Sequence, residues 1–308
     1  MAIKGADEID VGGHRLRISS LDRVVFPRAG VTKGALLDYY VRVADTMLAH
    51  LRERLLHMHR YPEGVDGPRF WQKGCPEHRP EWMALAPVWS EAKGATIDYC
   101  VVNELASLLW AVNIGSIELH TSLHTRDAMQ RPTALAFDLD PGEGVDVLGC
   151  GEVALRLRAL LDGVGLCGLV KTSGSKGLQV YVPLNTDVTY AETKPLAKAI
   201  AQTLEAQTPD RVVSQMAKAR RRGRVLVDWG QNTEHKSMVC AYSVRAKERP
   251  TVSTPVGWDE VESAVERGDA RQLVFEMGDV LARVEQCGDL FGDVLTLEQE
   301  LPRLAGAV

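Results

Sequence analysis

Two hydrophobic periodicities alternate along this chain and predict a mixed α/β protein. Apolar residues spaced about 3.6 positions apart predict a long helix over 33–56 and further helices over 103–115, 151–162 and 191–207. From residue 258 onward the pattern is again helical and amphipathic. Shorter stretches of alternating apolar and polar residues predict strands between these helices. The strands are expected at 11–19, 69–73, 96–102, 116–120, 133–142, 166–172, 178–184, 225–228 and 242–249.

The most informative predicted strand, 133–142, ends in two acidic residues. Successive side chains of a strand face opposite sides, so Asp138 and Asp140 share one face and the Leu and Phe side chains share the other. Two like charges about 7 Å apart repel each other, and a cation between them is the simplest explanation. Oxygen ligands favour Mg²⁺ or Mn²⁺. The alternative is an ordinary strand end, with Asp140 opening a Pro-Gly turn and Asp138 solvated.

Two further segments carry groups suited to phosphates or metals. The polar loop 173–177 can aim backbone N–H groups and Lys176 at a phosphate, although a plain hairpin turn is the alternative. It lacks the Walker pattern, which argues against a P-loop ATPase or kinase. The basic run 218–224 leads into the strand 225–228, whose alternation brings out a third carboxylate, Asp228. A solvated basic turn is the alternative for that run.

Aromatic and histidine residues add candidate binding groups upstream. Phe70 and Trp71, flanked by basic residues, can stack on bases of single-stranded or gapped nucleic acid, unless both are core aromatics. The strand 116–120 places His120 on the same face as Glu118, although a single histidine on a strand is more often structural. The short connection to 133–142 predicts that these two strands are neighbours in one sheet.

Composition limits the class of protein. The chain has 308 residues, 45% of them hydrophobic, and no repeat or linker, which predicts one compact unit. A net charge of −5 argues against a protein covered in basic charge but leaves room for a local basic surface. No stretch of about 18 apolar residues predicts a membrane span. The N-terminus lacks the pattern of a secretory signal, so we expect a cytosolic protein.

The six cysteines are scattered without a C-x-x-C pair, which predicts reduced thiols rather than a disulfide framework. Cys75 and His78, with His57 and His59, offer an alternative zinc site. This combination lacks the paired spacing of structural zinc sites, and we therefore do not expect zinc.

Five motifs occur in a fixed order along the chain. They are His120, Phe-Asp138-Leu-Asp140-Pro-Gly, Thr-Ser173-Gly-Ser-Lys176-Gly, Val-Asp228 and Tyr-Ser-Val-Arg245-Ala. Their order and separation resemble the archaeo-eukaryotic primase superfamily. Within it, the chain is most similar to the polymerase domain of bacterial ligase D and its stand-alone primase-polymerase relatives of non-homologous end joining, over essentially its whole length.

The resemblance implies a fold class and a domain plan. The fold would be a two-part α/β (α+β) primase-polymerase fold, with an antiparallel sheet resembling an RNA-recognition module, flanking helices and a smaller N-terminal α/β region. A single catalytic domain would span 1–308. Within it, residues 1–115 would mainly bind DNA and a 5′-phosphate, and residues 116–308 would mainly form the catalytic sheet and the C-terminal helices.

The implied activity is template-dependent nucleotidyl transfer that fills gaps or extends ends in DNA repair, with a preference for ribonucleotides. Two Mn²⁺ or Mg²⁺ ions would be the cofactors, and an NTP or dNTP would be the substrate. The catalytic and metal-binding residues would be Asp138, Asp140 and Asp228. The nucleotide-binding residues would be His120, Ser173, Lys176, Arg245 and Gln179, the last at a position where relatives often carry His.

The DNA-binding set is drawn from the N-terminal region: Arg23, Lys33, Arg60, Phe70, Trp71 and Lys73. Arg23 and Lys33 lie near the predicted start of the first long helix, where free N–H groups favour an anion such as a 5′-phosphate. The expected partners are gapped or end-containing DNA, Ku and a DNA ligase. We expect a monomer that is located in the cytoplasm near the nucleoid and does not bind membranes. Two alternatives remain open from the sequence, a two-metal nuclease and a non-catalytic DNA-end-binding module, and primer extension separates them.

Overall fold

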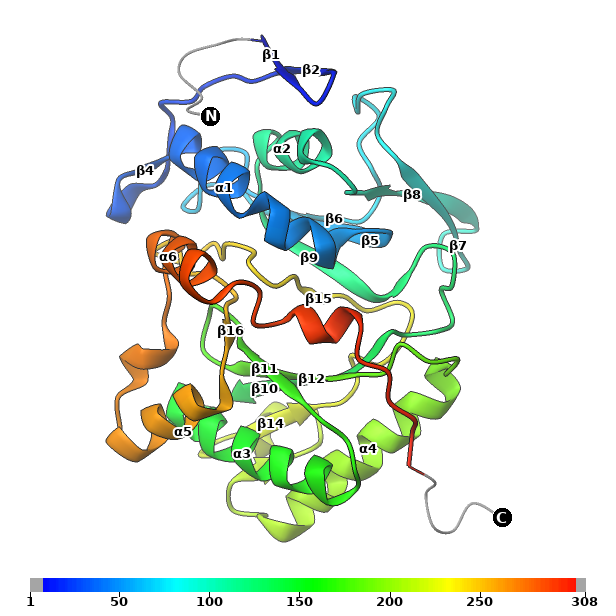
Figure 1. Cartoon of the computed structure of the whole chain (residues 1–308), viewed down its shortest axis with the longest axis vertical. Coiled ribbons are helices and arrows are strands. Elements are labelled where there is room, and N and C mark those ends of the chain that lie inside the picture. Colours follow the sequence, from blue (N-terminus) through cyan, green and yellow to red (C-terminus); the bar gives the residue numbers. More distant parts are fainter. Residues whose placement is uncertain (1–7, 303–308) are drawn as a thin grey trace. The chain divides into compact units, whose positions relative to one another are not determined.

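The computed structural model describes residues 8–302, which divide into two compact units (Figure 1). Unit 1 contains residues 8–122, 237–253 and 276–288, and unit 2 contains 123–236, 254–275 and 289–302. Most of the N-terminal stretch considered for a secretory signal lies outside the described residues. No helix within 8–302 is long and apolar enough to cross a membrane.

Unit 1 is built on a sheet of the strand order β15-β9-β5-β8-β7, with β6 paired to β5. Its helices α1 and α2 pack against each other, and α6 packs on α1. The helices are α1 (Lys33–Leu51), α2 (Leu105–Asn113) and α6 (Met277–Cys287), with a short 3₁₀ turn η1 (Pro27–Ala29). The sheet strands are β5 (Arg54–Arg60), β6 (Phe70–Gln72), β7 (Leu85–Ser90), β8 (Ala95–Val101), β9 (Ser116–Thr125) and β15 (Met238–Val239). Two small hairpins precede them, β1 (Glu8–Val11) with β2 (His14–Arg17) and β3 (Val24–Phe26) with β4 (Val31–Thr32).

Unit 2 is built on a second six-stranded sheet of the order β13-β14-β10-β12-β11-β16. All its pairings are antiparallel except that of β13 with β14. The strands are β10 (Ala134–Pro141), β11 (Leu169–Thr172), β12 (Leu178–Pro183), β13 (Val212–Val213), β14 (Val225–Asp228) and β16 (Pro255–Val256). The helices are α3 (Val147–Gly163), α4 (Tyr190–Gln207) and α5 (Trp258–Arg267), with 3₁₀ turns η2 (Lys218–Arg220), η3 (Ala270–Leu273) and η4 (Gly292–Leu295).

One face of the unit 2 sheet is predominantly apolar and packs against α3 and α4, which lie beneath the sheet in Figure 1. Leu135, Phe137 and Leu139 of β10 are completely buried in this core. Burial of side chains of this size stabilises the fold by about 1.5–3 kcal/mol each, so the register of β10 is strongly fixed. The opposite face of the same strands is therefore left for polar side chains, as the alternation predicted.

The mixed α/β class is confirmed, but several local predictions are wrong. The first helix ends at Leu51 rather than Leu56, because Glu53 adopts a left-handed backbone with φ 58° and β5 begins at Arg54. Glu104, not Asn103, caps α2, in a capping box with Ser107. The Asn103 side-chain amide instead forms two hydrogen bonds with Glu53, accepting from its backbone N–H and donating to its carboxylate.

Two predictions about strand placement are also wrong. His120 and Asp138 do not lie on neighbouring strands of one sheet, since β9 pairs with β15 in the first sheet and β10 pairs with β12 and β14 in the second. The predicted strand 242–249 is irregular, and an isolated bridge between Val244 and Val252 takes its place.

The prediction of reduced thiols is wrong at one pair, because Cys75 and Cys100 form a disulfide. The segment after β6 runs beside β8, where Cys75 N donates to Asp98 O at 2.6 Å and the two cysteine Cα atoms are 4.9 Å apart. This separation suits a disulfide. A bridged Cys75 cannot supply a thiolate, which removes the zinc alternative built on it.

Candidate active site

A row of polar side chains crosses four neighbouring strands of unit 2. Asp138 on β10 is paired with Asp228 on β14 and with Gln179 on β12. Gln179 is in turn paired with Lys171 on β11. Directly opposed residues of antiparallel strands project from the same face, and so does Asp140, two positions beyond Asp138. We call Lys171, Gln179, Asp138, Asp228 and Asp140 the acid row.

Two carboxylates of the acid row accept hydrogen bonds from nearby amides. Asp138 Oδ1 accepts from Gln179 Nε2 at 3.0 Å. Asp228 accepts from the Gly230 backbone and from Gln231 Nε2, both at 2.8 Å. Asp228 is buried and Asp138 half-buried, whereas Asp140 is exposed. The row is thus fixed inside the fold and reaches solvent at Asp140.

Negative charge in the acid row is only partly compensated. Burial, together with the charges of Asp140 and Asp228, raises the pKa of Asp138 to about 7. The hydrogen bond from Gln179 and the charge of Lys171 act in the opposite direction but do not outweigh these effects. A carboxyl group that is hard to ionise beside two other carboxylates favours the addition of a cation.

The donor set of the acid row fits a divalent cation, since carboxylate oxygens are the ligands that Mg²⁺ and Mn²⁺ prefer. Within residues 8–302, however, no three His, Cys, Asp or Glu side chains already stand in a metal-binding arrangement. Asp138 and Asp228 direct oxygens at neighbouring amides instead. The row therefore supplies the right ligand types without the finished ligand geometry.

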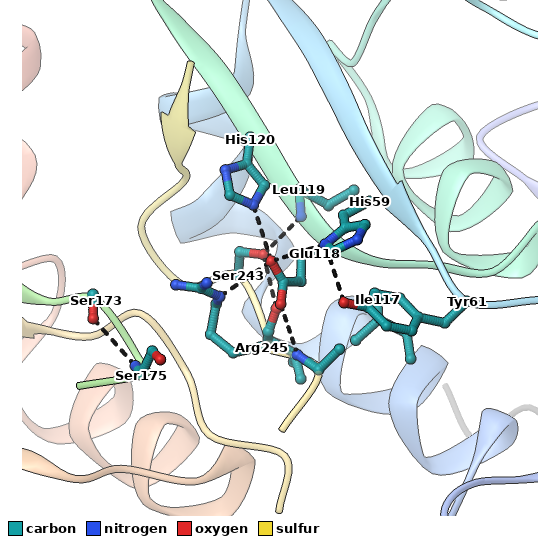
Figure 2. A network of polar contacts seen from close by, with 12 residues as sticks. His59, Tyr61, Ile117, Glu118, Leu119, His120, Ser173, Ser175, Ser243 and Arg245 are labelled. Atoms are coloured by element: carbon teal, nitrogen blue, oxygen red, sulfur yellow. Dashed lines mark hydrogen bonds and ion pairs between the residues drawn. The ribbon is translucent and has the colours of Figure 1, made fainter. Parts of the chain in front are cut away.

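The loop between β11 and β12 is closed by its own serine. Ser173 Oγ accepts from the backbone N–H groups of Ser175 and Gly177, both at 3.2 Å, and the first of these bonds is drawn in Figure 2. A β-carbon at Gly177 would collide with the carbonyl oxygen of Leu139, so glycine allows the loop to lie against β10. Lys176 is exposed at the tip of this loop. The loop is thus compact, with two of its backbone N–H groups directed at its own serine and the Lys176 side chain exposed.

In unit 1, His120 and Arg245 meet at one buried carboxylate, Glu118 (Figure 2). Glu118 Oε2 lies 3.1 Å from His120 Nε2, 3.3 Å from Arg245 Nε and 3.5 Å from His59 Nδ1. Its other oxygen accepts from the Ala246 backbone at 3.0 Å. We call Glu118, His59, His120 and Arg245 the Glu118 cluster.

The charge state of the Glu118 cluster follows from these contacts. Burial alone would raise the pKa of Glu118, but hydrogen bonds from His120 and His59 and the charge of Arg245 outweigh it and hold that pKa well below the usual range. Burial lowers the pKa of His120 to about 4. At neutral pH the cluster therefore pairs one carboxylate with one guanidinium, and His120 is neutral. Because the carboxylate can only accept, the His120 proton lies on Nε2.

An aromatic surface lies directly beside this cluster. The Trp71 ring stacks on His59 with centroids 4.5 Å apart and meets His120 edge-on at 4.7 Å. Trp71 and its neighbour Phe70 nevertheless stay exposed, at 54% and 44%. An exposed ring that packs on one side and is open on the other is suited to stacking on a base, and we call the Trp71 ring the aromatic platform. Phe70, the preceding residue of β6, projects from the opposite face of the strand. The alternative that both are core aromatics is wrong.

Arg60 contacts the Phe70 ring on the other face of β6. Its guanidinium lies 5.2 Å from the Phe70 ring centroid and donates to Gln72 at 2.6 Å and to Ile114 O at 2.7 Å. Burial lowers its pKa. Arg60 thus fixes β6 through its own contacts, while Lys73 lies just after the strand.

Arg23 and Lys33 line one pocket of unit 1, with Ser19, Tyr61, Asn113 and Gly115 among its other walls. Lys33 Nζ donates to Ser19 O at 2.8 Å, and Arg23 donates to Pro62 O at 2.6 Å. Burial and the nearby charge of Arg23 lower the pKa of Lys33 to about 8. Two cations held together in this way are ready to receive an anion.

Comparison with known proteins identifies the family of the chain. A family model described as the LigD primase-polymerase domain matches residues 32–291. The chain belongs to this family. Membership in the LigD primase-polymerase family confirms the predicted resemblance to the polymerase domain of bacterial ligase D.

The relatives of this LigD-family chain include multidomain bacterial repair proteins. It is 37% identical to the multifunctional non-homologous end joining DNA repair protein LigD of Mycobacterium tuberculosis, covering 90% of this chain and 36% of that protein. It is 30% identical to the bifunctional LigD of Bacillus subtilis, covering 94% and 45%. The chain therefore spans less than half the length of these relatives.

A solved structure matches most of the fold. The polymerase domain of M. tuberculosis ligase D in complex with DNA superimposes with a TM-score of 0.85 at 34% identity, covering 92% of this chain and 99% of that one. This similarity in sequence and structure confirms the fold class of the LigD-family chain.

Sequence reasoning missed three residues that organise the LigD-family candidate sites. Glu118 shares a predicted strand face with His120, but the sequence assigns it no role, and its contact with Ala246 spans 128 positions. His59 enters from sequence only as a zinc alternative. Lys171 lies on the polar face of β11. Its charge within a predicted strand could have identified it from the sequence as a candidate site residue.

Proposed function

We propose that this chain is a template-dependent polymerase that adds nucleotides to a 3′ end at gaps or ends in DNA. The observation that carries the proposal is the acid row, in which three carboxylates share one face and their negative charge is only partly compensated. Two divalent ions bound there would activate the 3′-hydroxyl and neutralise the leaving pyrophosphate. Asp138, Asp140 and Asp228 would hold them.

Other residues are assigned to the nucleotide. Arg245 supplies a fixed positive charge, and neutral His120 supplies hydrogen bonding rather than charge. The Ser173 loop would receive a phosphate group chiefly through the exposed ammonium of Lys176. Preorganised donors of this kind stabilise charge where it develops in phosphoryl transfer. We retain the predicted preference for ribonucleotides and for Mn²⁺ as part of this proposal.

The pocket of Arg23 and Lys33 is assigned to the 5′-phosphate at the far side of a gap. Phe70 and Trp71, with Lys73, would engage bases and backbone beside it. The cations converge within one pocket, and a terminal phosphate carries more charge than an internal diester, which supports the assignment. The complex of the M. tuberculosis polymerase domain with DNA supports DNA as the ligand.

The wider setting is proposed from the relatives. Their names describe non-homologous end joining, so we propose that this chain acts in bacterial double-strand break repair, in the cytoplasm near the nucleoid, with Ku and a DNA ligase as functional partners. We also propose that it acts as a monomer and as one catalytic domain.

A primer-extension assay tests the proposal. A labelled primer on a gapped template is incubated with Mn²⁺ or Mg²⁺ and with NTP or dNTP. Growth of the primer, lost in Asp138→Asn, is the expected result. Shortening of the primer would support a nuclease instead, and binding without any change in length would support a non-catalytic end-binding module.

A further inference from the structure

The polar face of the unit 2 sheet contains a cation that the proposed reaction does not use. Lys171 is 1% exposed, and burial of an ammonium group is costly unless hydrogen bonds and charges compensate it. Its Nζ donates to Gln179 Oε1 and lies 5.7 Å from the Tyr181 ring centroid. Lys171 thus lies at the far end of the acid row, two strands away from Asp138.

Gln179 joins this cation to the carboxylate. Its Oε1 accepts from Lys171, and its Nε2 donates to Asp138 Oδ1 at 3.0 Å. An ammonium has only donors and an ionised carboxylate only acceptors, so the amide can satisfy both neighbours in one orientation alone. A flipped amide would set its NH₂ group against Lys171 and its oxygen against Asp138. Lys171 therefore determines which end of Gln179 faces the carboxylate.

These contacts use both polar ends of Gln179, which is 3% exposed. Its side chain is thereby directed along the sheet, from β11 to β10, by neighbours on either side. From the sequence, Gln179 is expected to bind the nucleotide. Its two hydrogen bonds give the side chain a different role, the link between Lys171 and Asp138.

We propose that Lys171, acting through Gln179, is a positioning residue that holds the Asp138 carboxylate ready for a divalent ion. The proposal rests on the function proposed above, since it assigns Asp138 to the metal. Partners that orient a metal ligand typically change metal affinity by about 10- to 100-fold when they are lost.

A simple charge effect would act in the opposite direction. If Lys171 were only a positive charge near the site, its removal would strengthen the binding of a cation. If it acts through the amide, its removal weakens binding, and only while Gln179 is present. The sign of the effect and its dependence on Gln179 therefore separate the two explanations.

The test measures Mn²⁺ affinity of the full chain by calorimetry, without nucleotide or DNA. We expect Lys171→Met and Gln179→Leu each to weaken Mn²⁺ binding about tenfold or more, and the double variant to be no weaker than the worse single variant. Lys194→Met, an exposed lysine of the same unit, is the matched control and should match the wild type. In primer extension, the single variants should need more Mn²⁺ but approach the wild-type kcat at saturation.

Three results would overturn the proposal. They are unchanged or tighter Mn²⁺ binding in Lys171→Met, losses that multiply in the double variant, and wild-type binding that does not depend on Asp138. The last result alone would also remove the metal role assigned to the acid row. If Lys171→Met does not fold, Gln179→Leu and Gln179→His decide the matter. Imidazole can both accept and donate, so the histidine variant should retain most of the affinity that the leucine variant loses.

Discussion

Two carboxylates in this protein, one buried and one half-buried, have opposite surroundings. Glu118 in unit 1 is met by two histidines, one arginine and one backbone N–H, and its pKa is lowered. Asp138 in unit 2 receives one amide hydrogen bond from Gln179 and faces two further carboxylates, and its pKa is raised. The negative charge of Glu118 is thus balanced by partners within the protein, whereas that of Asp138 is only partly balanced.

The difference separates an organising role from a binding role. A carboxylate with all its partners inside the protein fixes the side chains around it and gains little from another cation. A carboxylate beside like charges is stabilised by any cation that arrives. We therefore regard Glu118 as the group that arranges His120 and Arg245, and the acid row as the place where an external ion acts.

The largest expected effect is on catalysis by the acid row. Asp138→Asn, Asp140→Asn and Asp228→Asn should each reduce nucleotide addition to background, because an incompletely held metal pair cannot promote the transfer. Primer extension measures this, with circular dichroism as the control for folding. A variant that retains activity within about tenfold of the wild type would show that its carboxylate is not a required ligand.

The next effect is on the stability of unit 1. Glu118→Gln should lower the free energy of unfolding by about 3 kcal/mol, because it leaves the half-buried guanidinium of Arg245 without its counter-charge. Denaturant unfolding measures the change. Glu266→Gln, at an exposed position of α5, should stay close to the wild type. A decrease in the free energy of unfolding below about 0.5 kcal/mol, the usual range for a surface substitution, would contradict the claim that Glu118 balances the charge of its neighbours.

A smaller effect is expected at the aromatic platform. Trp71→Ala should weaken binding to a gapped duplex about tenfold, because one base loses its stacking partner. Trp71→Phe retains a ring and should lose less. Fluorescence anisotropy with a labelled duplex measures both. Equal binding by wild type and Trp71→Ala would remove the platform from the DNA-binding surface.

The smallest effect concerns pH and the pocket of Arg23 and Lys33. The pKa of Lys33 is lowered to about 8, so its ammonium is present below that pH and is lost as the pH rises through it. The preference for a gapped duplex with a 5′-phosphate over one with a 5′-hydroxyl should therefore fall a few-fold between about pH 7 and 9. Lys33→Arg, which stays charged, should keep the preference constant. A preference in the wild type that is also constant would argue against Lys33 as the phosphate ligand.

Much of the acid row could be predicted from sequence because the relevant information is local. Alternation over 133–142 and 225–228 determines which face each carboxylate occupies, and the apolar partners fix that register. The polar loop at Ser173 was likewise found from its small residues. Family resemblance then added the order of the motifs, and the matching family confirms the class.

The remaining features depend on contacts between distant segments. Leu55 and Leu56 fit a helical spacing and a strand equally well, and the left-handed turn at Glu53 decides between them. The disulfide joins cysteines 25 positions apart, and only the course of the chain beside β8 brings them together. The link from Lys171 to Asp138 exists only once β11, β12 and β10 are in register.

The central claim is that unit 2 offers the cation site and that Glu118 is already satisfied. The most direct test is the melting temperature of wild type, Asp138→Asn and Glu118→Gln with EDTA and with excess Mn²⁺. With EDTA, Asp138→Asn should melt no lower than wild type, because it relieves repulsion, whereas Glu118→Gln should melt lower. Mn²⁺ should raise the melting temperature of wild type and Glu118→Gln but not that of Asp138→Asn. Stabilisation of Asp138→Asn by Mn²⁺ to the same extent as wild type would contradict the account.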